Sequence, residues 1–176
     1  MRARIWLLPA VVLLVAPACS EPAQDNAAPR TTAPPARPTE RVTISDETFT
    51  LELAATPIYR NRGLMYRTEI ARDGGMLFVF PEAFLQSFWM VNCLVDIDII
   101  YLDPSGRVTA THQMTVEEPR RANETDEEYR ERMNHYSSRI PAQFVIELAG
   151  GTLDRLDVKE GDLIDFDVER LRKLAE

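Results

Sequence analysis

The sequence predicts a mainly β protein of the α+β class, a small barrel or sandwich of seven or eight short strands with one or two short helices. Apolar and polar residues alternate over Val42–Ala55, and continuous apolar runs of strand length follow farther along the chain. Turn-forming residues separate these runs at short intervals. With 176 residues, of which 45% are hydrophobic and 27% charged, the chain is long enough for one globular domain with appendages.

The first 40 residues are predicted to lie outside that domain. Residues 1–18 have the form of a secretory signal peptide, with basic Arg2 and Arg4 followed by the apolar segment Ile5–Ala18. That segment is too short to cross a bilayer, which takes about 20 residues. Residues 19–40 are rich in Pro and Ala and have no apolar period, so we expect a disordered tether.

Cys19, the first residue of the tether, is predicted to carry a lipid anchor. The segment Ala16–Cys19 resembles the lipobox of bacterial lipoproteins, although its small residues also fit ordinary signal peptidase, which would cut the same bond. We expect a lipoprotein of the bacterial cell envelope, facing the periplasm or the exterior and held at the membrane by the lipid alone. Lipidation of Cys19 would leave Cys93 without a partner for an intrachain disulfide.

The folded domain is expected to span residues 41–169 and to begin with two strands. Val42–Ile44 is the first, and after a tight turn the second strand directs Phe49, Leu51 and Leu53 to one face. Thr56-Pro57 then predicts a helical turn that is capped by the Thr56 hydroxyl and ends at Gly63.

Most of the remaining domain is also predicted to be strand. A turn at residues 103–106 predicts a hairpin between the strand before it and residues 107–116. The other expected strands are short apolar runs bounded by Gly, Pro or charged residues: Met76–Phe80, Ser87–Val91, Asp98–Leu102, Gln143–Leu148 and Leu163–Val168.

Residues 117–139 break this strand pattern and read as a charged helical insertion. Thr125-x-x-Glu128 has the form of a capping box, which predicts a helix start. Tyr129, Met133 and Tyr136 provide a thin apolar stripe for docking, while the rest of the insertion is expected to face solvent. Residues 170–176 are expected to form a charged C-terminal tail, helical and frayed.

Composition and motifs exclude several function classes. The formal net charge of −8 is unfavourable for binding to a phosphate backbone, so no nucleic-acid partner is expected. The sequence contains no phosphate loop, dinucleotide fingerprint or serine-nucleophile elbow, and no cofactor is expected.

Several motifs in the expected domain occur in an order typical of one family. They are Arg60-x-x-Gly63-Leu64-Met65-x-Arg67, Gly75-Met76-Leu77-Phe78-x-Phe80, Phe88-Trp89-Met90-x-Asn92, Ile97-Asp98-Ile99-Ile100 and the run Pro141–Gly150. With these motifs, Val42–Val168 resembles the domain-of-unknown-function family 192 (DUF192). The resemblance implies a small, mostly β domain without an established activity. Cys93 and Asp96 stand where the family usually has Thr and Pro, so the loop after Asn92 is expected to differ in shape.

The polar residues inside these motifs are the candidates for a site. A convergent site could hold an anionic ligand through a two-pronged arginine contact. The alternative is a buried arginine–carboxylate network that fixes the strands, with Asp98 paired to Arg60 or Arg67. The candidate ligand-binding residues are Arg60, Arg67, Trp89, Asn92, Asp98 and Glu147.

Two further hypotheses compete with a non-catalytic ligand-binding or scaffolding domain whose partner is a small ligand or an envelope protein. Asp98 and Glu147 could act as the acid and base of a hydrolase if they lie close together. Met90, His112 and Met114 have the spacing of Met…His-x-Met ligands for copper(I), to which thioether and imidazole groups are suited. No other metal site is expected, because two histidines and one free cysteine do not make a closed zinc site.

Overall fold

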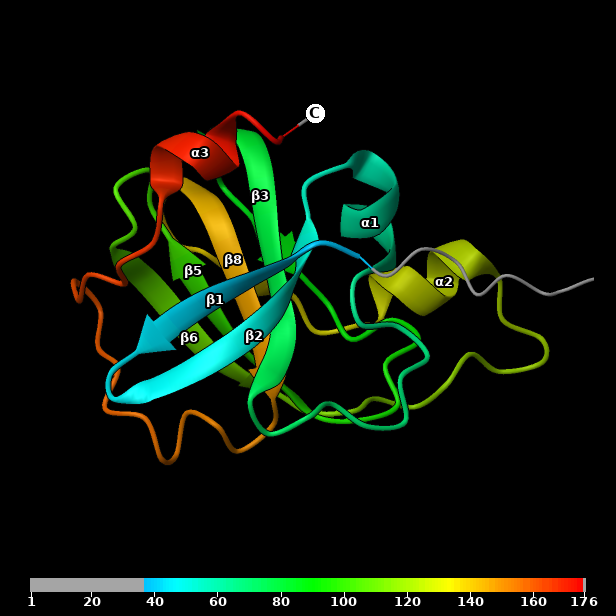
Figure 1. Ribbon diagram of the computed structural model, residues 1–176. Coiled ribbons are helices and arrows are strands. Elements are labelled where there is room, and N and C mark those ends of the chain that lie inside the picture. Colours follow the sequence, from blue (N-terminus) through cyan, green and yellow to red (C-terminus); the bar gives the residue numbers. More distant parts are fainter. Residues whose placement is uncertain (1–36, 176) are drawn as a thin grey trace, which may run out of the picture. The chain divides into compact units, whose positions relative to one another are not determined.

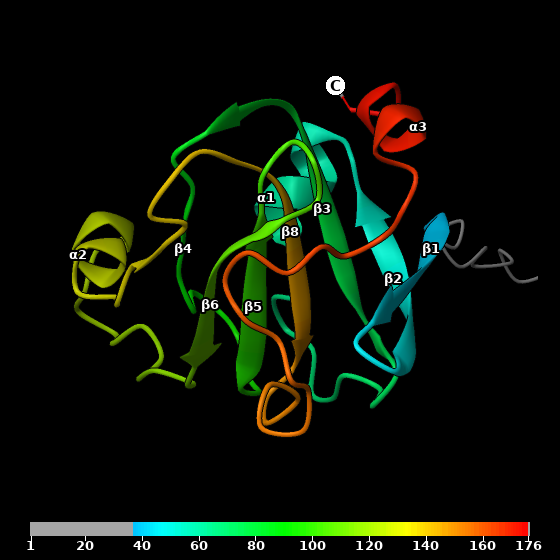
Figure 2. The same cartoon turned by 90° about the vertical axis from the view of Figure 1, so that its left-hand side faces the viewer.

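A six-stranded mixed sheet organises the computed structural model of the protein, which describes residues 37–175 (Figure 1). Its strand order is β1-β2-β3-β8-β5-β6, and only β2 and β3 run parallel. The strands are β1 (Thr39–Ile44), β2 (Glu47–Ala54), β3 (Gly74–Phe84), β8 (Ala142–Ala149), β5 (Ile97–Leu102) and β6 (Val108–Met114). Figure 2 shows them side by side in this order.

The predicted class is confirmed: the described part of the chain is mainly β, with eight strands and three short helices. The two remaining strands, β4 (Ser87–Phe88) and β7 (Tyr136–Ser137), form a small sheet of their own. The large sheet ends at β1 and β6 rather than closing on itself, so the fold is a layered one and not a barrel.

The predicted signal peptide, Cys19 and nearly all of the predicted tether lie outside the described residues. The last residues of that tether belong to the fold, because β1 begins at Thr39 and pairs with β2 from its first residue. Arg37 also reaches β2, where its guanidinium lies 3.0 Å from the Glu52 carboxylate. No helix within residues 37–175 is long and apolar enough to cross a membrane.

Each face of the large sheet buries its own apolar cluster. One face carries Leu51, Leu77 and Ile146 and packs against the segment after β8 and against α3 (Val168–Arg172). The other face carries Phe78, Ile99 and Val145 and contacts Leu64 and Met90. In Figure 1, α3 lies on one side of the sheet, while α1 (Pro57–Arg62) and α2 (Asp126–Glu131) lie on the other.

Both ends of the helix after β2 were predicted, but only one is capped as expected. Gly63 closes α1 with a φ of 49°, a conformation that suits glycine, and its N–H donates to the Tyr59 carbonyl oxygen. Thr56 makes no side-chain capping hydrogen bond, contrary to the prediction. Pro57 lies in the first turn, where its missing N–H costs no hydrogen bond.

The insertion is more firmly attached than the sequence indicated. Its predicted capping box is present, with the Thr125 and Glu128 side chains each bonded to the other's backbone N–H. Tyr129 is only 5% exposed, and together with Met133 it packs on Val91. The helix α2 is therefore part of a small core of its own and not a solvent-facing appendage.

Two predicted strands are shorter or absent. Of Ser87–Val91, only the first two residues pair as β4. Leu163 forms one isolated bridge to Arg107, where this segment touches the start of the edge strand β6, and the chain then crosses in front of the sheet (Figure 2). The chain then turns into α3, whose Leu171 is fully buried, so the predicted frayed tail is docked on the core.

Candidate functional site

A cleft of about 640 Å³ opens beside the face of the sheet that α1 and β4 cover, and we call it the Trp89 cleft. Its volume lies in the range of about 300–1,000 Å³ typical of small-molecule sites. Four segments and two single residues line it: Arg60–Met65, Phe78 and Phe80, Gln86–Trp89, Val91–Cys93, and then Arg130 and Glu147.

Aromatic rings form much of the wall. Phe78 of β3 and Phe88 of β4 pack edge to face, with ring centroids 5.0 Å apart. Trp89 is 38% exposed and packs edge to face against His135, at 5.4 Å between centroids. Such rings offer flat apolar contact area to a ligand.

Glu147 supplies a buried carboxyl group to this cleft. The side chain extends from β8, is 5% exposed, and its Oε2 has no hydrogen-bond partner within residues 37–175. Burial raises the pKa of Glu147 to about 8, so the group is mostly protonated at neutral pH. A methyl group added at Gly63 would lie 3.7 Å from this oxygen, so the missing side chain there leaves space in front of the carboxyl.

Gln86 supplies a second polar group of the same kind. Its backbone is held by Ser138, through Gln86 N–H to Ser138 Oγ at 2.9 Å and Ser138 N–H to the Gln86 carbonyl oxygen at 3.0 Å. Its side chain is 4% exposed, yet Nε2 has no partner in the described chain. Of the three buried side-chain polar atoms without a partner in residues 37–175, Gln86 Nε2 and Glu147 Oε2 belong to residues of this one cleft, and Thr109 Oγ1 is the third.

Three arginines add positive charge to the wall. Arg60 donates to the carbonyl oxygens of Ala55 at 2.6 Å and Val79 at 3.0 Å, and its guanidinium lies 5.3 Å from the centroid of the Phe80 ring. Arg62 and Arg130 are exposed. The Trp89 cleft is thus aromatic on its sides, cationic at its opening, and lined by two unpaired polar groups within.

The insertion holds one edge of the cleft in place. Asn92 adopts a φ of 58°, which asparagine tolerates better than most residues, and its N–H donates to Tyr129 Oη at 3.2 Å. Its carbonyl oxygen accepts from Tyr66 N–H at 2.9 Å. The backbone around Asn92 is therefore tied both to α2 and to the segment after α1.

Cys93 lines the cleft but is unsuited to nucleophilic chemistry. Burial, followed by the nearby Glu147 carboxyl, raises the pKa of Cys93 to about 12. The thiol is therefore protonated at neutral pH, and the thiolate is the reactive form.

Arg67 and Asp98 do not join the Trp89 cleft, and the expected pairing between them is wrong. Arg67 Nη2 lies 2.6 Å from Glu52 Oε1 and 2.7 Å from Oε2, an ion pair that links the segment after α1 to β2. Asp98 Oδ2 instead accepts from Leu153 N–H at 2.6 Å, and the backbone amides of residues 151–153 satisfy this carboxylate. The buried polar groups of the motifs thus do not form one network.

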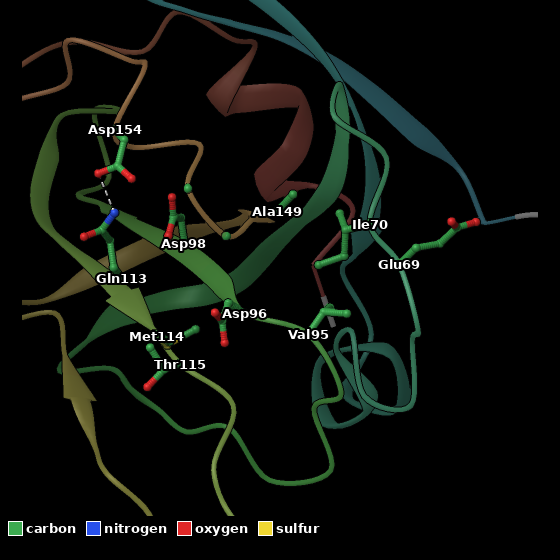
Figure 3. A pocket seen from close by; sticks show the side chains of 12 residues that line it. Glu69, Ile70, Val95, Asp96, Asp98, Gln113, Met114, Thr115, Ala149 and Asp154 are labelled. Atoms are coloured by element: carbon green, nitrogen blue, oxygen red, sulfur yellow. Dashed lines mark hydrogen bonds between the residues drawn. The ribbon is translucent and has the colours of Figure 1, made fainter.

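Asp98 lines a second, acidic pocket at one end of the sheet, also of about 640 Å³ (Figure 3). Burial raises the pKa of Asp98, an effect that its backbone hydrogen bonds oppose. Asp154 accepts from Gln113 Nε2 at 2.8 Å, as the dashed line in Figure 3 marks. Glu69 and Asp96 are the other acidic residues that line this acidic pocket.

The sheet register separates the two carboxyls of the hydrolase hypothesis. In the β5–β8 ladder Asp98 faces Leu148 and Ile99 faces Glu147. Because directly opposed residues share a face and neighbours along a strand alternate, Asp98 and Glu147 lie on opposite faces. The structure does not bring them together as an acid–base pair.

The residues of the copper hypothesis are used in packing. Met90 and Met114 are both buried in the cluster on one face of the sheet. The His112 ring donates from Nε2 to the Ser137 carbonyl oxygen at 2.8 Å. Among residues 37–175, no group of three or more His, Cys, Asp and Glu side chains is placed to hold a metal ion.

Four of the six predicted ligand-binding residues meet in the Trp89 cleft: Arg60, Trp89, Asn92 and Glu147. Sequence reasoning missed Gln86, Arg62 and Arg130. Gln86 had a usable signal, since Gln86 and Ser87 are the two polar residues that interrupt the apolar run Phe84–Trp89. Arg130 had none, because its position depends on how the insertion docks.

The fold and the cleft together define a class of protein: a small domain with an open mixed sheet and an aromatic cleft that has cationic side chains at its opening. Within that class the chain belongs to the DUF192 family, described as an uncharacterized ACR, whose model matches residues 40–166. A UPF0127 protein of Thermococcus gammatolerans is 34% identical over 123 residues, 67% of each chain. One of Thermococcus kodakarensis is 30% identical over 130 residues, 71% of this chain and 69% of its own.

Solved structures show the same fold. A protein from Sinorhizobium meliloti, whose name assigns it provisionally to transcription regulation, matches with a TM-score of 0.61 and 31% identity over 76% of this chain and 97% of its own. A protein of unknown function from Novosphingobium aromaticivorans matches with a TM-score of 0.59 and 28% identity, covering 73% of this chain and 85% of that one.

Proposed function

We propose that this DUF192 protein is a cell-envelope lipoprotein whose domain binds a small ligand, without catalysis, in the Trp89 cleft. One observation carries the proposal. Gln86 Nε2 and Glu147 Oε2 are buried without partners, and both residues line that cleft. Leaving a buried polar atom unpaired costs about 1–3 kcal/mol, so such atoms are retained where another molecule can pair with them.

The chemistry of the cleft supports binding rather than turnover. Its thiol, Cys93, is held in the protonated form. Glu147 is the one carboxyl group among the lining residues, because Asp98 lies on the other face of the sheet. A single buried carboxyl with no second acid, base or activated nucleophile beside it lacks the constellation that hydrolysis uses.

The envelope location is supported by the predicted signal peptide and by Cys19, which follows it in a lipobox-like sequence. The name of the Sinorhizobium relative points to transcription, but a formal net charge of −8 disfavours contact with a phosphate backbone. A small ligand is therefore the better supported partner for this chain.

A fragment screen observed by amide NMR tests the proposal. Bound fragments should shift the signals of Gly63, Asn92 and the Trp89 indole N–H, which lie along the cleft. Shifts confined to the acidic pocket around Gly150, or none in either place, would refute ligand binding at the Trp89 cleft.

A matched pair of variants supplies the control. Ser87→Trp adds bulk at an exposed position of the Trp89 cleft, and Thr115→Trp adds the same bulk at an exposed position of the acidic pocket. Fragment binding should be lost in Ser87→Trp and kept in Thr115→Trp. Incubated fragments should be recovered chemically unchanged, whereas their conversion to product would contradict the non-catalytic role.

A further inference from the structure

From the charges and the unpaired groups of the Trp89 cleft we infer the chemical class of its ligand: an anion with a flat apolar body and a hydrogen-bond acceptor at its buried end. This inference rests on the proposed ligand-binding function and adds the features that the ligand must carry. We define the rim of the cleft by the exposed Arg62 and Arg130, and its inner end by the buried Gln86 and Glu147.

The sign of the ligand's charge follows from the lining. Arg60, Arg62 and Arg130 are the cationic side chains on the wall, and Glu147 is the one acidic side chain there. Burial keeps that acid mostly protonated at neutral pH, so among the lining residues no ionised acid balances the charge of Arg62 and Arg130 at the rim. This is a local reversal in a chain whose formal net charge is −8.

The rim arginines are available to such an anion. Neither Arg62 nor Arg130 forms an ion pair with any residue in 37–175. The Arg62 guanidinium lies over the Tyr66 ring, 5.8 Å from its centroid, which orients it while leaving its donors open. Planar guanidinium groups favour carboxylate and phosphate oxygens, with which they form paired hydrogen bonds.

The inner end calls for an uncharged acceptor. Gln86 Nε2 can only donate hydrogen bonds, and protonated Glu147 has an O–H to donate. A carbonyl or ether oxygen could accept from either group. An ammonium or amidinium group would meet the Gln86 donor and would find a neutral acceptor, not a carboxylate, at protonated Glu147.

The wall between these two ends is apolar. Phe78, Phe88 and Trp89 present ring edges and faces, so the part of the ligand that joins the acceptor to the anion should be flat and apolar. A ligand therefore has one preferred orientation: its anionic group lies at the rim arginines, its flat body lies along the aromatic rings, and its acceptor faces the buried donors.

A set of matched naphthalene probes, titrated at pH 7 and followed by calorimetry, tests the sign of the charge. Naphthalene-2-carboxylate, -2-carboxamide and -2-carboxamidine share a body and differ in charge. We expect the carboxylate to bind about tenfold or more tightly than the amidine, with the carboxamide between them. Equal or tighter binding of the amidine would overturn the inferred charge and leave the proposed function standing. Failure of all three probes to bind the cleft would count against both.

Arginine variants locate the charge. Arg62→Gln and Arg130→Gln should each weaken carboxylate binding about two- to fivefold, the usual strength of an exposed charge contact, and leave carboxamide binding unchanged. Arg41→Gln changes the net charge equally at an exposed position on β1 outside the cleft and should alter neither affinity. If Arg41→Gln weakens carboxylate binding as much as the rim variants do, the rim arginines do not bind the anionic group, and the inferred class of ligand is wrong.

The acceptor is tested by a second pair of probes. 6-Acetylnaphthalene-2-carboxylate carries a carbonyl oxygen opposite its anion, and 6-ethylnaphthalene-2-carboxylate replaces it with an apolar group of similar size. The acetyl probe should bind about fivefold more tightly, because it pairs donors that the ethyl probe leaves unsatisfied. Equal affinity, or tighter binding of the ethyl probe, would overturn the inferred acceptor.

Discussion

Replacing Glu147 by Gln should remove a steep pH dependence from the stability of this protein. The buried carboxyl has a pKa of about 8 in the folded protein, against an ordinary value of 4.5. Between these values the unfolded chain releases the proton while the folded chain keeps it, so the free energy of unfolding falls as pH rises. Each pKa unit corresponds to about 1.36 kcal/mol, so the whole interval carries about 5 kcal/mol.

The pH dependence that Glu147 gives to the free energy of unfolding has the opposite sign to that of most carboxylates. Below pH 4.5 Glu147 is protonated in both states and has no pH effect, and its stabilising contribution is fully present there. It is lost progressively as pH rises through the interval up to about 8, where the folded protein also ionises. Glutamine keeps the shape of the protonated acid and cannot ionise.

Urea unfolding at pH 5, 6.5 and 8, followed by circular dichroism, measures the effect. The difference in unfolding free energy between Glu147→Gln and the parent protein should shift in favour of the variant by about 1.4 kcal/mol per pH unit. Glu82→Gln, the same change at an exposed position of β3, is the control. A difference for Glu147→Gln that stays constant from pH 5 to 8 would refute the reasoning, since the group would then be solvated or paired with a cation.

Three other predictions concern the anchor, the insertion and the acidic pocket. Cys19→Ser should move the protein from the membrane fraction to the soluble envelope fraction, and unchanged fractionation would contradict lipidation. Tyr129→Ala should cost about 3 kcal/mol in urea unfolding because it empties a buried aromatic site; a cost below about 1 kcal/mol would return the insertion to the solvent-facing role first expected. Asp98→Ala should cost about 2 kcal/mol by leaving the amide of the half-buried Leu153 unpaired, and a loss under about 0.5 kcal/mol would show that water replaces the carboxylate.

Local patterns predicted local structure well. Alternation placed Phe49, Leu51 and Leu53 on one buried face of β2, and the capping box located the start of α2. These signals depend on residues a few positions apart, whose geometry the strand and helix periods set. The predicted strand Leu163–Val168 did not form. An extended apolar segment becomes a strand only if it stays beside a sheet edge, and this one meets the edge at Leu163 and then crosses a face of the sheet.

The candidate site could be predicted only in part, because it combines residues that are far apart in the sequence. Trp89 and Asn92 are near neighbours in the chain, so their shared position followed from one motif. Whether Asp98 joins Glu147 depends on the register of β5 against β8, strands about 40 residues apart in sequence, and a shift of one residue would exchange the faces. The pairing of Arg67 with Glu52 rather than with Asp98 likewise depends on which strands become neighbours in the sheet.

The attachment of the insertion lets the opening of the Trp89 cleft vary independently of the large sheet. Its helix is closed by its own capping box and is attached mainly through Tyr129 and Met133, without adding a strand to the large sheet. Mutation or grafting of this segment could therefore alter the charge that Arg130 brings to the opening while the ladder that carries Glu147 stays intact. On the proposed function, affinity for different ligands can be tuned at one wall, as in scaffolds whose loops vary over a constant frame. Engineered libraries confined to residues 117–132 would do this while leaving His135 and Ser138, which contact Trp89 and Gln86, unchanged.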